Sequence, residues 1–283
     1  MVHVSGSSWR SWGGVPHLER VRLKSIAAGA RAGFPFTVPV VAGLTEVSVD
    51  APVTCFVGEN GSGKSTLLEG IALAAGLPTV GSDDAARDPW LESQRKLARA
   101  LTLVWRQRTR RGFFLRAEDF FGFQRRLARE RAELESRLEE VDRDYQDRSD
   151  LARGLARGPA AASLADMDRR YGADPDARSH GEAFLQLFKA RFVPGSLILL
   201  DEPEAALSPQ NQLGLVAMIL AMVEEGAQFV IATHSPIVLA VPGARLLSFD
   251  GGKVEETRYD ALGHVQLTRD FLNDPERFLR RLR

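Results

Sequence analysis

Residues 58–66 read Gly-Glu-Asn-Gly-Ser-Gly-Lys-Ser-Thr, a glycine and four further residues followed by Gly-Lys-Ser. Glycines at this spacing let the backbone bend tightly, so that successive N–H groups converge on phosphate oxygens. A lysine in this pattern reaches the β- and γ-phosphates, and the following hydroxyl ligates Mg²⁺. The predicted nucleotide contacts are Gly58, Glu59, Asn60, Gly61, Ser62, Gly63, Lys64, Ser65 and Thr66, with Lys64 also catalytic and Ser65 also a metal ligand.

The flanking sequence fits this interpretation. Residues 52–57 read as a buried strand, and residues 67–73 read as a helix whose N-terminus faces the loop. A strand, a phosphate loop and a helix in this order predict a site for a nucleoside triphosphate with Mg²⁺.

Composition limits the alternatives. The chain has 283 residues, 44% of them hydrophobic and 26% charged, with a formal net charge of zero. These values are typical of a globular protein and give no overall attraction to nucleic acid or membrane. A single cysteine, Cys55, excludes a disulfide within the chain, and no signal peptide or membrane span is evident, so we expect a cytoplasmic protein.

The first half of the chain predicts strands and then a helical region. Residues 20–24, 34–36 and 47–49 suggest a small antiparallel layer, and residues 101–105 and 112–115 suggest two more strands. The charged segment 124–145 has a narrow apolar stripe, typical of one helix or a short helical hairpin. Residues 154–176 read as irregular.

The second half alternates strands and helices. Residues 196–200 and 228–232 read as strands around a helix over 210–224, which indicates a parallel sheet covered on both faces. Residues 246–249 and 254–257 suggest a hairpin, and residues 268–282 a last helix. We therefore predict an α/β fold with a mostly parallel sheet flanked by helices, an antiparallel N-terminal layer and an inserted helical subdomain.

This layout predicts one domain over residues 1–283. The expected nucleotide-binding core is residues 18–75 and 190–250, and the insertion is residues 76–189. Residues 251–283 form the end of the hairpin and the C-terminal helix.

Two acidic residues end an apolar strand over residues 196–200. Asp201 lies where a carboxylate can hold Mg²⁺, and Glu202 follows it, placed to accept a proton from an attacking water. His234 ends the next strand, and we expect its imidazole near the γ-phosphate. Upstream, Ser179 and Gly181 open a helix that can donate to phosphate.

The order of these motifs resembles the ATP-binding-cassette (ABC) class of P-loop ATPases, over residues 18 to 250. Within it, the chain looks like the stand-alone bacterial ABC-type proteins often labelled AAA-family ATPases. The resemblance implies a head-to-tail dimer that encloses ATP, in which Ser179 and Gly181 of one subunit contact the γ-phosphate bound to the other. It also implies that residues 206–208 form a loop between the two sites.

Two further roles follow from the resemblance. The glutamine that ligates Mg²⁺ in that class should follow the strand at 112–115, where Glu118 is the candidate metal ligand; a surface ion pair with Arg116 is the alternative. The aromatic ring that stacks on adenine should precede the phosphate loop, where Phe34 or Phe36 is the candidate, and core packing is the alternative.

The process driven by hydrolysis is open to three interpretations. The first is an ATP-driven switch acting on nucleic acid or a protein partner, because residues 105–111 carry four arginines and a tryptophan, although the simpler explanation of these residues is a solvated loop in an arginine-rich chain. The second is the ATPase subunit of a transporter, with residues 120–123 as an exposed apolar docking groove. The third is a P-loop kinase, which Glu202 and His234 disfavour.

Overall fold

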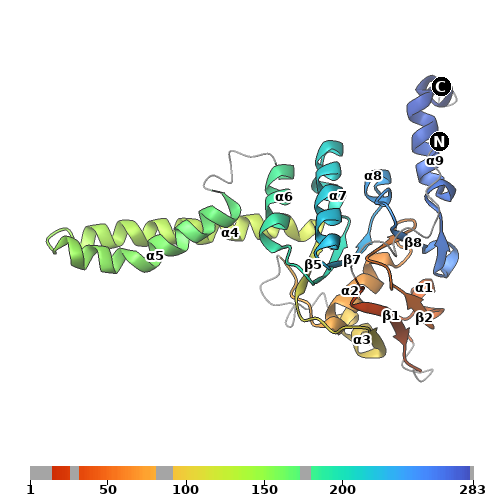
Figure 1. Cartoon of the computed structure of the whole chain (residues 1–283), viewed down its shortest axis with the longest axis horizontal. Coiled ribbons are helices and arrows are strands. Elements are labelled where there is room, and N and C mark those ends of the chain that lie inside the picture. Colours follow the sequence, from red (N-terminus) through yellow and green to blue (C-terminus); the bar gives the residue numbers. More distant parts are fainter. Residues whose placement is uncertain (1–14, 26–31, 81–91, 173–179, 281–283) are drawn as a thin grey trace.

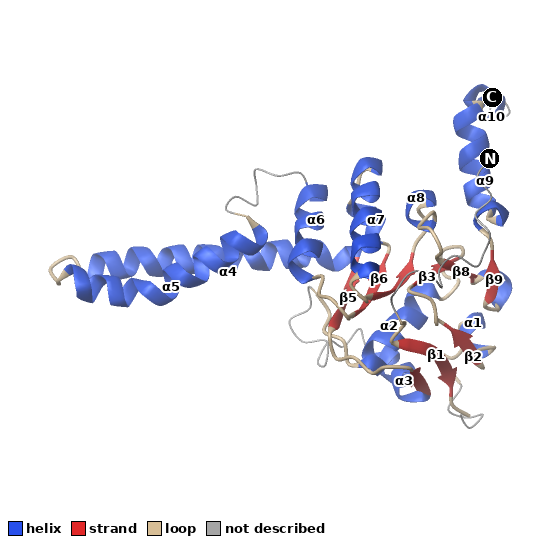
Figure 2. Cartoon of the chain, viewed as in Figure 1, coloured by secondary structure: helices blue, strands red, loops and turns tan. Residues whose placement is uncertain are grey.

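The computed structural model describes residues 15–25, 32–80, 92–172 and 180–280. Two sheets form its centre, and helices pack on them (Figure 2). The strands are β1 (Leu18–Leu23), β2 (Glu46–Ser48), β3 (Val53–Val57), β4 (Leu101–Trp105), β5 (Gly112–Arg116), β6 (Leu197–Asp201), β7 (Gln228–Ala232), β8 (Arg245–Ser248) and β9 (Glu255–Thr257). The α-helices are α1 (Pro39–Ala42), α2 (Lys64–Ala75), α3 (Glu92–Ala100), α4 (Ala117–Asp144), α5 (Asp150–Tyr171), α6 (His180–Arg191), α7 (Pro209–Glu224), α8 (Pro236–Leu239), α9 (Gly263–Asn273) and α10 (Pro275–Leu279).

The larger sheet has the strand order β5-β6-β7-β3-β8-β9. The first five strands are parallel, and β9 pairs antiparallel with β8. This confirms the predicted mostly parallel sheet and the closing hairpin. Because parallel strands end at the same edge, the segments that follow β3, β5, β6, β7 and β8 are brought together there.

Helices cover both faces of this sheet. Strands β3, β6 and β7 are buried along their whole length, and their side chains alternate between two clusters. Cys55, Leu200 and Ile231 belong to the cluster on the face of α6, α7 and α8. Phe56 and Leu199 belong to the cluster under α2. Figure 1 shows α6, α7 and α8 rising from one side of the sheet and α2 on the other.

The smaller sheet is antiparallel, with the order β2-β1-β4. It confirms the predicted N-terminal layer, with two differences. The segment around Phe34 and Phe36 forms turns instead of a strand, and the later strand β4 completes the layer.

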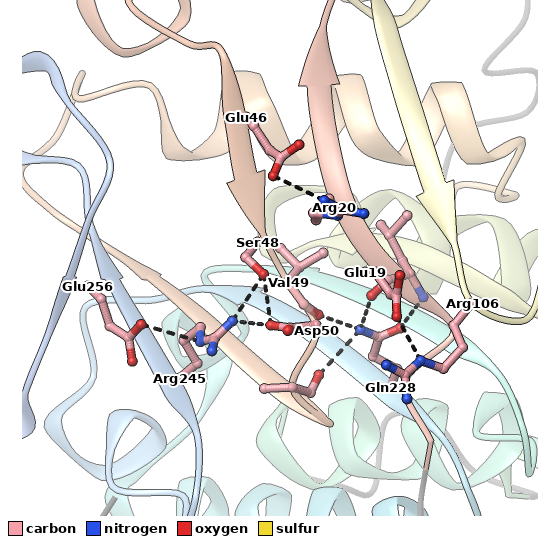
Figure 3. Close-up of polar contacts among 12 residues, drawn as sticks. Glu19, Arg20, Glu46, Ser48, Val49, Asp50, Arg106, Gln228, Arg245 and Glu256 are labelled. Carbon is pink, nitrogen blue, oxygen red and sulfur yellow. Dashed lines mark hydrogen bonds and ion pairs between the residues drawn. The ribbon is translucent and has the colours of Figure 1, made fainter.

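A buried glutamine joins the two sheets (Figure 3). Gln228, at the start of β7, is 1% exposed. Its Oε1 accepts from the N–H of Leu18 at 2.8 Å, and its Nε2 donates to the carbonyls of Leu18 at 2.8 Å and Val49 at 2.6 Å. All of its polar atoms are therefore satisfied, as a buried amide requires.

Helices α4 and α5 form an antiparallel hairpin that projects from the sheets (Figure 1). The prediction of irregular structure over 154–176 is therefore wrong for residues 154–171, which are helical. Ion pairs hold the two helices together, Arg131 with Asp168 and Arg157 with Asp142.

Two of the three aromatic residues that were predicted to form an apolar groove at the base of α4 are buried, and the side chain of the third, Phe121, lies outside the described residues. Phe120 is 1% exposed and Phe123 is 6% exposed. The Phe120 ring packs on Phe184, and the Phe123 ring packs on Tyr171. These two rings therefore belong to the core and not to a docking surface.

The C-terminal region forms two helices where one was predicted. Helix α9 starts earlier than expected, at Gly263, and ends at Asn273. Asp274 has φ −148° and ψ 74°, and Pro275 begins α10. A residue before proline avoids the helical conformation, which explains the break.

Among the described residues, none of the helices combines the length and apolar character needed to cross a membrane.

Candidate nucleotide site at the carboxyl edge of the sheet

The phosphate loop lies between β3 and α2 and has the backbone that its glycines permit. Gly58, Gly61 and Gly63 have φ values of 150°, 80° and 101°, which L side chains rarely adopt. A Cβ atom at Gly63 would also lie 2.7 Å from a methyl group of Val38. The loop therefore depends on glycine here both for its backbone and for its packing against the segment before α1.

Lys64 opens α2 and is 4% exposed. Its Nζ donates to the carbonyls of Gly58 at 2.7 Å and Glu59 at 3.0 Å. Burial lowers the pKa of this ammonium, and the carboxylates of Glu202 and Asp201 act in the opposite direction. The cation is thus held inside the loop, where it can exchange carbonyl oxygens for phosphate oxygens.

The two predicted magnesium ligands are in contact. The Ser65 hydroxyl donates to Oδ1 of Asp201 at 3.0 Å, although the residues are 136 positions apart. Burial raises the pKa of Asp201 to about 7, and the hydrogen bond from Ser65 acts against that rise. A hydroxyl and a carboxylate are oxygen ligands of the type Mg²⁺ prefers, and Mg²⁺ is commonly completed by substrate phosphates and water.

Glu202 has an unusual backbone. Its φ of 49° and ψ of 47° place it in the left-handed region, and it alone among the described non-glycine residues has a positive φ. Its N–H donates to the carbonyl of Ala232 at 2.8 Å. Its carboxylate lies 3.7 Å from Nε2 of His234. The strained conformation directs the predicted base and the predicted histidine to the same place.

Glu204 fixes the segment that carries His234, a role that the sequence reasoning missed. Its Oε1 accepts from the Thr233 hydroxyl at 2.7 Å and from the N–H groups of His234 at 2.6 Å and Ser235 at 3.0 Å. A carboxylate that accepts several N–H and O–H donors holds a turn firmly. The only signal in the sequence is its position two residues after Glu202.

Asp250 was also missed. Its Oδ1 accepts from the N–H of Glu59 at 3.0 Å. The segment after β8 therefore holds the phosphate loop, although the two residues are 191 positions apart in the sequence. The same oxygen would lie 3.1 Å from a Cβ at Gly58. This close approach gives a second reason for glycine at that position.

Arg116 ends β5 beside Asp201 and organises the acidic groups around it. It pairs with Glu69 at 3.0 Å and with Asp119 at 2.8 Å. It also pairs with Glu118 at 3.4 Å, and the Glu118 side chain is 75% exposed. The predicted metal ligand Glu118 therefore makes the alternative ion pair, while it also lines the same pocket as Ser65 and Asp201.

Three other predicted contacts have different outcomes. Ser179 lies outside the described residues. Gly181 is buried, and a Cβ there would lie 2.4 Å from the Asn211 amide and 3.4 Å from the Ala206 carbonyl. The start of α6 is thus packed on α7 and on the carbonyl of Ala206. Phe34 is 50% exposed and lies in a turn. Phe36 packs partly into the core, which agrees with core packing, the alternative to adenine stacking.

The residues present fit a nucleotide with Mg²⁺. A pocket of about 430 Å³ is lined by Ser65, Asp201 and Glu202 together with Arg116. Ser62 Oγ and His234 Nε2 are buried and have no hydrogen-bonding partner among the described residues. Buried polar atoms are rarely left unpaired, so such atoms beside a phosphate loop are explained by a phosphate ligand.

Two family models match the chain. One, described as "AAA domain", matches residues 42–100, and another, described as "AAA domain, putative AbiEii toxin, Type IV TA system", matches residues 183–240. The first covers the phosphate loop, and the second covers Asp201, Glu202 and His234.

Curated relatives match over most of the chain. The hemin import ATP-binding protein HmuV of Pseudomonas fluorescens is 29% identical over 216 residues, 76% of this chain and 78% of HmuV. The cytochrome c biogenesis ATP-binding export protein CcmA of Rhodopseudomonas palustris is 28% identical over 207 residues, 73% of this chain and 90% of CcmA. A solved nucleotide-free ATP-binding cassette from an ABC transporter aligns over 92% of this chain and 97% of its own length, at 16% identity and a TM-score of 0.44. The family models, the curated relatives and the phosphate loop together support an ABC-class P-loop ATPase.

Proposed function

We propose that the carboxyl edge of the larger sheet binds ATP and hydrolyses it with Glu202 as the general base. The observation that carries this proposal is the contact of Ser65 with Asp201, beside Glu202 and His234. Ser65 and Asp201 would hold Mg²⁺, with Glu118 as a further candidate ligand. The metal would supply positive charge at the phosphate oxygens.

The chain's own groups have separate tasks in this proposal. The loop N–H groups and Lys64 bind the β- and γ-phosphates. Glu202 orients a water molecule and takes its proton as the water oxygen attacks the γ-phosphorus, and the bond to the β–γ bridging oxygen breaks. His234 and Lys64 stabilise the charge on the transferring group. ADP and phosphate are the products.

Replacing the base tests the mechanism. We expect Glu202→Gln to lower ATP turnover about 10²- to 10⁴-fold and to leave ATP binding intact, because the amide cannot take the proton. The measurement is phosphate release without any acceptor, which also separates hydrolysis from a kinase reaction. Glu224→Gln, on the exposed end of α7, is the matched control. Wild-type turnover in Glu202→Gln would contradict the proposal.

We further propose that hydrolysis takes place in a head-to-tail dimer. The order of the elements supports this, because α6 begins at His180 and precedes the strand that ends at Asp201, as the signature helix does in the class that the chain resembles. Ser179 and Gly181 of one subunit would contact the γ-phosphate in the other. We expect Glu202→Gln with ATP to elute as a dimer and with ADP as a monomer. A monomer in both conditions would contradict this arrangement.

The task that we favour is a cytoplasmic switch acting on nucleic acid or a protein partner. Residues 106–108 and 110–111 are exposed, which leaves their arginines accessible, although Arg106 pairs with Glu19 at 2.7 Å. Exposed arginines can neutralise DNA phosphates. The experiment is ATP turnover with and without linear duplex DNA at physiological salt. Stimulation that Arg108→Ala with Arg110→Ala removes would support DNA, and unchanged turnover would favour a protein partner.

The second candidate is the ATPase subunit of a transporter. HmuV and CcmA are named for import and export, which favours it. The burial of Phe120 and Phe123, two of the three aromatic residues of the docking groove that it was expected to use, counts against it. Co-purification with a membrane protein would support this candidate over the switch.

A further inference from the structure

The chain returns to the nucleotide site after β9. The Tyr259 hydroxyl donates to the carbonyl of Pro236 at 2.9 Å, which attaches the segment before α9 to the start of α8. Leu262 is 5% exposed and Val265 is 2% exposed, and both belong to the core cluster. The first turn of α9 is therefore fixed to the body of the protein. Figure 2 shows α9 starting near β8 and β9.

This attachment places His264 beside His234. The two imidazole rings have centroids 6.5 Å apart and planes inclined by 69°. Nε2 of His264 is buried and has no hydrogen-bonding partner among the residues that the structure describes, and the same holds for Nε2 of His234. Packing between two rings does not explain why both would leave a buried nitrogen unpaired.

The charged groups around the phosphate loop also act on His264. Burial is the main cause that lowers the pKa of His264, and His234 and Lys64 lower it further. Asp250, which holds the phosphate loop, acts in the opposite direction. The charges of His234, Lys64 and Asp250 thus all act on His264. One buried cation and two imidazole nitrogens without a hydrogen-bonding partner among the described residues can together donate to an anion.

We propose that His264 is a further ATP-binding residue, which donates from Nε2 to the terminal phosphate next to His234. The inference rests on the proposed function, and it adds a contact supplied in cis by the C-terminal segment. Because ADP lacks this phosphate, the contact favours ATP over ADP.

The test measures the affinities for ATP and ADP with Mg²⁺, in a Glu202→Gln background so that ATP is not consumed. His264→Ala and His264→Leu remove the donor, and the leucine also fills the volume of the ring. We expect each to weaken ATP binding about tenfold, the effect of a hydrogen bond to a charged group, with ADP binding changed less than twofold. His264→Gln keeps an N–H donor and should retain most of the affinity.

Controls separate this inference from the proposed function. Asp270→Ala changes an exposed residue of the same helix and should bind both nucleotides as the parent does. Lys64→Ala should lose ATP binding; if it does not, the proposed function fails. If Lys64→Ala loses binding but both His264 variants keep the parent's ratio of ATP to ADP affinity, only the inference about His264 is overturned. An equal loss for ATP and ADP would also overturn it.

Discussion

The carboxyl edge of the larger sheet and the α4–α5 hairpin are built in opposite ways. At the edge, side chains from distant parts of the sequence meet, as in the hydrogen bond from the Glu59 N–H to Asp250. In the hairpin, the ion pairs join neighbouring turns or the two facing helices, as in Arg153 with Asp150 and Arg131 with Asp168. The edge depends on contacts between particular distant residues, whereas the hairpin is held by ion pairs within and between its two helices.

Burial follows the same division. The strands that lead to the edge are buried throughout. In α5, only Ala160 is buried among the residues described, and Leu151 and Leu155 are 75% and 72% exposed. A substitution should therefore cost much in the first region and little in the second. Glycines test this contrast directly, because a methyl group is the smallest side chain that can be added.

The largest effect is expected at Gly112, the first residue of β5. Its φ is 132°, and a Cβ there would lie 1.8 Å from the carbonyl oxygen of Leu197 on β6. We expect Gly112→Ala to destabilise the protein by about 3 kcal/mol, because backbone strain and overpacking act together. Thermal and denaturant unfolding measure this.

Gly195→Ala is the matched control for Gly112→Ala. Gly195 also has a positive φ, 64°, but nothing lies within 4 Å of its Cβ position. We expect Gly195→Ala to lower the free energy of unfolding by about 1 kcal/mol, because only the left-handed backbone conformation is unfavourable for alanine there. Equal losses in the two variants would mean that the close approach of β5 to β6 does not matter.

The contiguous motifs were the part of the site that sequence could predict. The phosphate loop, Asp201 and His234 each follow a short apolar strand, and parallel strands bring such positions to one edge. The contact between Ser65 and Asp201 agrees with that reasoning. The assignment of chemical roles to these residues stays a prediction until the variants are measured.

Glu204, Asp250 and His264 could not be predicted in the same way. Each of the three residues contacts a partner that is distant in the sequence. None of them lies in a motif or in a periodic pattern that would mark it. Their positions depend on how β7, β8 and α9 pack, which is decided by the whole core. Long-range polar contacts of this kind appear only once the tertiary structure is known.

The prediction of irregular structure over residues 154–176 failed because of local sequence signals. Gly154, Gly158 and Pro159 are signals of irregular structure, yet they lie inside α5. Pro159 lacks an N–H, which leaves the carbonyl of Leu155 without its usual helical donor. That residue is exposed, so water can satisfy the carbonyl. Packing on α4 then stabilises a helix that its own sequence does not favour.

An intermediate effect is expected at Glu204, on the edge. Glu204→Ala removes the acceptor of three donors on residues 233–235, and we expect about 2 kcal/mol less stability and about tenfold lower ATP turnover. Glu204→Gln keeps one oxygen acceptor and should lose much less. Unfolding and turnover are measured on both variants. Equal losses in Ala and Gln would show that the charge, and not the acceptor, holds this segment.

The smallest effect is expected in the hairpin, and its sign is opposite. Gly154 and Gly158 lie in helix α5 with nothing within 4 Å of their Cβ positions. We expect each Gly→Ala change to stabilise the helix by about 0.5–1 kcal/mol, because alanine loses less backbone entropy. Hydrogen exchange of α5 amides measures this gain. Gly76→Ala is the control, since its position is equally open but its φ is 70°.

The rate at which a thiol reagent labels Cys55 tests whether the stabilisation of α5 by these alanines also stabilises the larger sheet. Burial raises the pKa of its thiol to about 12, so reaction with a thiol reagent at neutral pH requires the core to open. If the hairpin unfolds independently, the two alanines slow exchange in α5 and leave the rate of Cys55 labelling unchanged. If labelling slows as well, the hairpin and the sheet unfold as one unit. The two regions would then differ in how well they tolerate substitutions, but not in their stability.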